Sequence, residues 1–124
     1  MIIRYKKTFE KIAMGLLSFM PAEKDLKVLQ QTIKEYETNE KWQLLLWKDD
    51  EDIIGLIGVV FADEDTVRIQ HISVNPSHRQ QGVGKAIVQG IKDVYPGKNI
   101  EGNELIISFL SKCKDVVGQE NINL

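Results

Sequence analysis

Residues 72–85 read Ile-Ser-Val-Asn-Pro-Ser-His-Arg-Gln-Gln-Gly-Val-Gly-Lys. The first three residues end an alternating apolar stretch, Asn-Pro is a turn signal, and apolar residues follow Gly84 at helical spacing. The stretch therefore predicts a strand, a glycine-rich turn and the start of a helix. The first N–H groups of a helix are unpaired and its dipole attracts negative charge, so this turn is a candidate phosphate-binding site.

Two familiar phosphate-binding motifs do not fit this turn. A Walker A loop would need glycine in place of Arg79 and Ser or Thr in place of Ala86. A dinucleotide-binding GxGxxG that begins at Gly82 would need a small residue in place of Ile87. Neither nucleotide-binding motif is therefore present.

Helices are predicted from apolar residues that recur every three or four positions. The first helix has one apolar face and Thr8 as its predicted cap; that face consists of Phe9, Ile12, Ala13, Leu16, Leu17 and Met20. Pro21 separates it from a second amphipathic helix, whose apolar residues are Leu26, Leu29, Ile33 and Tyr36. A third helix is predicted from Gly84 to Tyr95, ended by Pro96-Gly97, and a fourth is predicted to begin at Asn103.

Strands are predicted where apolar, β-branched and aromatic residues cluster or alternate. They cover Met1 to Tyr5, Trp42 to Lys48, Ile53 to Phe61, Thr66 to Val74 and a short piece from Asn99 to Glu101. Short acidic connections join the second, third and fourth of these, which predicts an antiparallel meander. Strands and helices together predict an α+β fold.

Composition limits the class of protein. The chain has 124 residues, the size of one domain (1–124), with 43% hydrophobic and 27% charged residues. Its 16 basic and 18 acidic residues give a net charge of −2, which argues against a nucleic-acid partner.

Cys113 is the only cysteine, which excludes an intrachain disulfide and predicts a reducing cytoplasm. No apolar run is long enough for a membrane span, and the basic residues before Ile12 lack the cleavage site of a signal peptide.

The pattern Arg79-x-x-Gly82-x-Gly84, placed after a strand, resembles the GCN5-related N-acetyltransferase (GNAT) superfamily. The resemblance extends over about residues 1–113. It implies a three-layer αβα fold, in which helices flank a mixed, mostly antiparallel sheet and the C-terminal part is shortened. The N-terminal segment is most similar to a small family member of the bacterial riboflavin operon.

The resemblance implies acetyl-CoA as acetyl donor and CoA as product, with no metal. The pyrophosphate would lie on the backbone amides from Gln80 to Lys85, and the Ile72 N–H would polarise the thioester carbonyl. The pantetheine arm would pair with the strand and contact Asn103. The implied cofactor-binding residues are Ile72, Ser73, Val74, Arg79, Gln80, Gln81, Gly82, Val83, Gly84, Lys85 and Asn103.

The general base does not follow from the family pattern. Family members often carry an acid or a histidine where this sequence has Arg68 and Gln70, and neither of these is a credible base. Histidine has an intrinsic pKa that suits a general base. Strand alternation, however, places His71 on the face opposite Gln70 and Ile72. A bulge in the strand would re-aim it; otherwise it is a structural histidine packed under a helix. Glu101 and a water chain are further alternatives.

The family's usual thiolate-protonating tyrosine is replaced by Leu110. A thiol with a pKa near 8.5 leaves as a thiolate with little help, so activity does not require that tyrosine. We expect direct transfer to the amine of a small molecule or peptide, and a homodimer is one way to complete the acceptor pocket. The alternative is a catalytically weak CoA-binding module linked to riboflavin metabolism.

Overall fold

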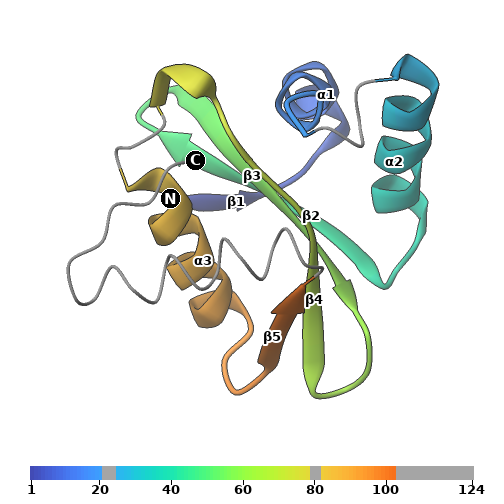
Figure 1. The fold of residues 1–124 in the computed structure, drawn as a ribbon, viewed down its shortest axis with the longest axis vertical. Coiled ribbons are helices and arrows are strands. Elements are labelled where there is room, and N and C mark those ends of the chain that lie inside the picture. Colours follow the sequence, from blue (N-terminus) through green and yellow to red (C-terminus); the bar gives the residue numbers. More distant parts are fainter. Residues whose placement is uncertain (21–24, 79–81, 103–124) are drawn as a thin grey trace.

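The computed structural model describes residues 1–20, 25–78 and 82–102. It contains a five-stranded sheet in the order β1-β2-β3-β4-β5. Helices α1 and α2 pack on one face of the sheet, and α3 packs on the other face (Figure 1). The strands are β1 (Ile2–Arg4), β2 (Trp42–Asp49), β3 (Asp52–Phe61), β4 (Thr66–Val74) and β5 (Asn99–Gly102). The helices are α1 (Glu10–Leu17), α2 (Leu26–Thr38) and α3 (Val83–Val94), with short 3₁₀ helices at Lys7–Phe9 and Pro76–His78.

The sheet confirms the predicted meander. The pairs β1·β2, β2·β3 and β3·β4 are antiparallel, whereas β5 returns through α3 to lie parallel to β4. A parallel neighbour requires such a crossover, because the chain must travel back along the sheet before it pairs. The predicted α+β fold with a mixed, mostly antiparallel sheet is therefore confirmed.

Two apolar clusters lie on opposite faces of the sheet because side chains alternate along each strand. Leu45 and Ile57 pack with Ile87 and Ile91 of α3. On the other face, strand residues pack with both N-terminal helices; this cluster includes Ala13, Leu16, Leu17, Leu29, Ile33, Tyr36, Leu44, Leu46 and Leu56. The central strands are thus covered on both sides, and residues of the helix faces named from periodicity take part in both clusters.

Three details of the helices differ from the prediction. Thr8 is not a cap: it lies in the 3₁₀ helix, and α1 starts after Phe9 without a side-chain cap. Ile12 is 41% exposed because α1 packs through the narrower stripe that contains Ala13 and Leu16. Leu26 is 61% exposed because it begins α2, ahead of the turns that reach the sheet.

The cap of α2 is Asp25, whose carboxylate accepts a 2.7 Å hydrogen bond from the Lys27 N–H. The predicted helix at Asn103, with Leu110 and Cys113, lies outside the described residues. Among residues 1–20, 25–78 and 82–102, no helix has the length and hydropathy that a membrane span requires.

Candidate functional site

The start of α3 has the geometry that the glycine-rich turn predicted. Gly82 is the N-cap in the left-handed region, with φ 77° and ψ 9°. Its carbonyl accepts the first helical hydrogen bond, from the Ala86 N–H at 3.0 Å. The N–H groups of Val83, Gly84 and Lys85 therefore belong to the first turn and have no carbonyl four residues earlier in the helix. Arg79, Gln80 and Gln81 lie outside the described residues.

In the described part of the chain, the pairing of β4 with β5 covers the N-terminal part of β4. Among the described residues, the register between the two strands runs from Thr66↔Asn99 to Ile69↔Gly102. In the next step β4 bulges: Val59 is opposite Ile69 and Gly58 is opposite His71, so Gln70 has no partner in the register. The bulge therefore begins next to the last pair that the described residues of β5 make, and β4 continues to Val74 as a partner of β3.

The backbone of Ile72 faces the edge of β4 that points away from β3. The Asn75 N–H donates to the Ile54 carbonyl at 2.8 Å, and bonded and non-bonded pairs alternate along an antiparallel ladder. Ser73 and His71 therefore form the next bonded pairs with β3, and the N–H of Ile72 points the opposite way. The family resemblance implies that this N–H polarises the thioester carbonyl.

The bulge also sets which side chains share a face. Ile69 and Ile72 both pack in the α3 cluster, although they are three positions apart and regular alternation would place them on opposite faces. His71 and Ser73 lie on the other face, where the Ser73 hydroxyl donates to the Leu16 carbonyl at 2.7 Å. The side chain of His71 thus lies on the face opposite that of Ile72, as alternation predicted. Because of the bulge, it also lies on the face opposite that of Ile69.

His71 is 8% exposed and contacts α2. Its Nδ1 lies 2.6 Å from the hydroxyl oxygen of Tyr36, a hydrogen-bond distance, and the two rings meet edge to face with centroids 5.6 Å apart. Trp42 also packs edge to face against Tyr36, with its ring centroid 5.0 Å from that of the tyrosine. The histidine is therefore held in one orientation by an aromatic neighbour.

Sequence reasoning did not identify Tyr36 as a site residue, because its spacing on α2 is that of an ordinary core position. The signal that could have found it is Gly58, a glycine in the middle of a strand, which often marks a close approach. A β-carbon at that position would lie 1.9 Å from the Tyr36 hydroxyl oxygen. Gly58 thus makes room for the hydroxyl beside its register partner His71.

Arg68 and Glu101 form an ion pair between β4 and β5. Arg68 Nε and Nη2 lie 3.0 and 2.9 Å from Glu101 Oε1, and both side chains are about half exposed. The carboxylate considered as an alternative base is therefore engaged by a guanidinium.

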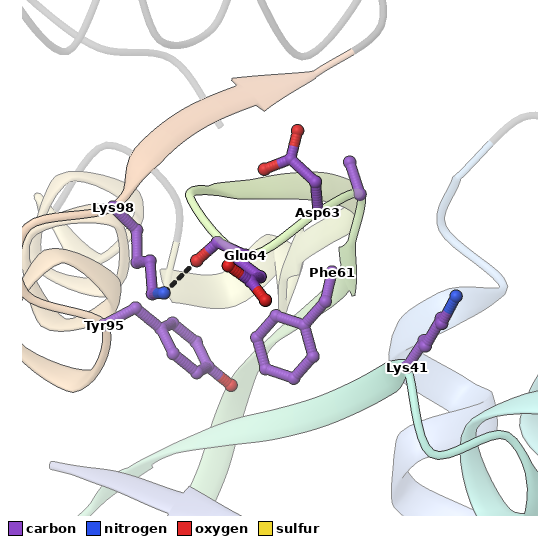
Figure 2. Close-up of a pocket in the computed structure, with 7 residues that line it drawn as sticks. Lys41, Phe61, Asp63, Glu64, Tyr95 and Lys98 are labelled. Atoms are coloured by element: carbon purple, nitrogen blue, oxygen red, sulfur yellow. Dashed lines mark hydrogen bonds between the residues drawn. The ribbon is translucent and has the colours of Figure 1, made fainter.

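A hollow of about 500 Å³ lies at the other end of α3, around Tyr95 and Phe61 (Figure 2). The two rings meet edge to face at 5.4 Å, and the Lys98 ammonium donates to the Glu64 carbonyl. A helix of this length separates the hollow from Gly82 by about 18 Å, at 1.5 Å per residue. The residues that line this hollow include neither the glycine turn nor the edge of β4 at Ile72.

Comparison with known proteins decides the family. The model of the acetyltransferase (GNAT) family matches residues 12–108. The chain belongs to the GNAT family. A protein of Bacillus methanolicus called "Uncharacterized N-acetyltransferase in lysA 3'region" is 62% identical over 120 residues, which are 97% of this chain and 100% of that protein.

Solved GNAT structures share the fold at low sequence identity. The structure of AAC(6')-Iy in complex with a bisubstrate analog covers 100% of this chain and 92% of its own, with a TM-score of 0.70 and 20% identity. A GNAT family acetyltransferase from Elizabethkingia anophelis with acetyl-CoA bound covers 73% of this chain and 54% of its own, with a TM-score of 0.57 and 21% identity. The described chain as a whole therefore has the GNAT fold, beyond the glycine-rich turn that first indicated it.

Proposed function

We propose that this GNAT chain is an acetyl-CoA-dependent N-acetyltransferase that transfers the acetyl group to a primary amine by direct attack in a ternary complex. The observation that carries the proposal is the position of the glycine-capped start of α3 next to the C-terminal part of β4, beyond the pairs that the described residues of β5 make. Family members crystallised with acetyl-CoA or with a CoA-linked bisubstrate analog support acetyl-CoA as the donor.

The described residues fit the phosphate end of that donor. Gly82 is exposed, and no described atom lies within 4 Å of the place that its β-carbon would take. A phosphate can thus reach the first-turn N–H groups of Val83, Gly84 and Lys85 without steric hindrance from this residue. The exposed ammonium of Lys85 would add a charge-assisted contact. Arg79, Gln80, Gln81 and Asn103 complete the proposed donor site.

The reaction would take place at the edge of β4 that faces away from β3, at Ile72. The amine nitrogen attacks the thioester carbonyl carbon, a C–N bond forms, the C–S bond breaks, and CoA leaves as a thiolate. The Ile72 N–H would donate to the carbonyl oxygen as negative charge develops on it. The backbone of Val74 would help to align the pantetheine arm along the strand, beside Ser73.

The attacking amine must lose a proton, and His71 is the proposed acceptor. Only the neutral amine is nucleophilic. The unperturbed pKa of an imidazole lies near the pH of the cell interior. Arg68 is a permanent cation and Gln70 does not titrate, so the positions before Ile72 supply no other base. The thiolate needs no acid, because the pKa of a thiol is near 8.5.

A thiol-release assay tests the activity. The chain is mixed with acetyl-CoA and a panel of polyamines, amino acids, peptides, aminoglycosides and riboflavin precursors. CoA release with at least one amine is the expected result. A rise of melting temperature with acetyl-CoA but no release with any amine would favour the alternative, a CoA-binding module linked to riboflavin metabolism. No rise at millimolar acetyl-CoA would contradict both.

The role of His71 has its own test. His71→Asn keeps a polar group near the position of Nδ1 and removes the titratable ring. We expect kcat to fall by about 10²–10⁴-fold, the usual contribution of a general base, with no change in the KM for acetyl-CoA. His78→Asn is the matched control, since His78 contacts Ser77 in the 3₁₀ helix rather than α2. An unchanged kcat in His71→Asn would exclude His71 as the base.

A further inference from the structure

Gly55 of β3 lies beneath the second turn of α3, at the end of the helix where the proposed donor site begins. A β-carbon on Gly55 would lie 2.7 Å from the Cδ1 atom of Ile87. From this close approach we infer that Gly55 is a positioning residue for the donor. It sets how closely α3 packs on the sheet, and so places the first-turn N–H groups that would bind the pyrophosphate. The inference rests on the proposed function, in which acetyl-CoA is the donor.

The space above Gly55 is closed by a helix side chain and by a strand backbone. The helix supplies Ile87, which is 1% exposed and packs in the cluster between α3 and the sheet. The strand supplies the carbonyl oxygen of Ser73, 3.4 Å from the added carbon. Two carbons pack best at about 3.5–4.0 Å, and a dense cluster leaves the isoleucine little room to turn aside. A methyl group at position 55 would therefore push Ile87, and α3 with it, away from the sheet.

No feature of the backbone requires glycine at position 55. Gly55 is buried in β3, the middle strand of the sheet, so it belongs neither to a turn nor to an edge. Gly82 and Gly97 are the described glycines with positive φ, so Gly55 has no left-handed backbone to accommodate. Glycine inside a strand weakens it and often marks the close approach of another segment. The approach of Ile87 is therefore the structural reason for this glycine.

The position of α3 matters because one donor molecule would contact both α3 and β4. Its pyrophosphate would bind the first-turn N–H groups of Val83, Gly84 and Lys85, and its thioester carbonyl would bind the Ile72 N–H. Val83, Ile87 and Ile72 pack in one cluster, so the packing of α3 sets the distance between the two ends of the site. A helix pushed off the sheet would lengthen that distance. One lost hydrogen bond to a charged group weakens binding about tenfold or more.

The test compares Gly55→Ala with Gly90→Ala. Both variants add a methyl group between α3 and the sheet, and the carbon added at Gly90 would lie 2.5 Å from the Cδ1 atom of Ile2. At Gly90, however, the nearest atoms outside the helix all belong to side chains, and Ile2 lies in the edge strand β1, away from β4. We expect the Kd for acetyl-CoA to rise about tenfold or more in Gly55→Ala and to stay at the wild-type value in Gly90→Ala.

Ile87→Val provides a rescue, because valine lacks the Cδ1 atom that the added carbon would meet. We expect Gly55→Ala/Ile87→Val to bind acetyl-CoA with the same Kd as Ile87→Val alone, which makes the two substitutions strongly non-additive. In proton–nitrogen NMR spectra, the amide signals of Val83, Gly84 and Lys85 should shift in Gly55→Ala and return in the double variant. A purely structural glycine would change the unfolding free energy but not the Kd of the folded protein.

The outcomes separate the inference from the proposed function. Wild-type binding of acetyl-CoA with an unchanged Kd in Gly55→Ala would overturn the inference and leave the proposed function intact, and so would an equal rise in Gly90→Ala. No binding by the wild type would overturn the proposed function, and the amide signals would then still decide whether Gly55 places the start of α3.

The double variant decides if Gly55→Ala does not fold. A folded Gly55→Ala/Ile87→Val protein with the Kd of Ile87→Val supports the inference. A double variant that does not fold, or that folds with a raised Kd, contradicts it, because the contact with the Cδ1 atom would then not be the cause.

Discussion

A β-carbon on Gly58 would lie 1.9 Å from the hydroxyl oxygen of Tyr36, and 2.4 Å from the ring carbon that bears it. The hydroxyl oxygen of the tyrosine and the ring carbon bonded to it thus already fill the space above this glycine. The ring of Tyr36 also packs against Trp42, with centroids 5.0 Å apart, so a shift away from Gly58 would disturb that contact. The contact links α2 to the middle of the sheet and depends on the absence of one methyl group.

Gly58→Ala should therefore destabilise the chain. Overpacking a dense core typically costs about 1–3 kcal/mol of unfolding free energy, which denaturant titration measures. Gly15→Ala is the control, because no described atom lies within 4 Å of its added carbon and alanine is the better helix former by about 0.5–1 kcal/mol. Gly15→Ala should stabilise. Equal stability of Gly58→Ala and the wild type would show that the tyrosine moves freely.

Gly82→Ala should weaken acetyl-CoA binding. Both Gly82 and Gly97 have φ 77°, and neither has a described atom within 4 Å of an added carbon, so alanine introduces the same backbone strain at each, about 1–2 kcal/mol. They differ only in place: one begins α3 and the other follows its end. Both variants should lose similar stability, but only Gly82→Ala should raise the Kd for acetyl-CoA in a titration. Equal Kd values would remove the α3 start from the donor site.

The strands and α3 were predictable because their signals are local. β-branched residues in β3 and β4 and the 3.6-residue period of α3 act within a few positions of the chain. The Tyr36–His71 contact was not predictable in this way, because 35 residues separate its partners and only the packing of α2 on the sheet joins them. The error at Thr8 has a local cause: an unforeseen 3₁₀ turn moved the start of α1 beyond it.

Ser73→Ala should destabilise the chain through a lost link between β4 and α1. The Ser73 hydroxyl is buried and donates to the Leu16 carbonyl at 2.7 Å. Its removal takes away a bond worth about 0.5–1.5 kcal/mol and removes a donor from a buried carbonyl, which adds to the cost. Ser18→Ala removes an exposed 2.6 Å bond to the Gly15 carbonyl and should change stability by less than about 0.5 kcal/mol. Denaturant titration of both variants measures the difference; equal losses would contradict the role of burial.

The unfolding free energy should fall as the pH rises above 10, and Tyr5 should contribute to the fall. Burial raises the pKa of Tyr5 above its usual value of 10.0, and the hydrogen bond to Glu37 and its negative charge raise it further. Between pH 10 and the higher folded pKa, the unfolded tyrosine has lost its proton and the folded one has not, so alkali favours unfolding. Tyr5→Phe should show a shallower fall in urea titrations at pH 9, 10.5 and 11.5. Some fall should remain, because burial also raises the pKa of Tyr95; an identical fall in both proteins would show that Tyr5 ionises alike in the folded and unfolded chain.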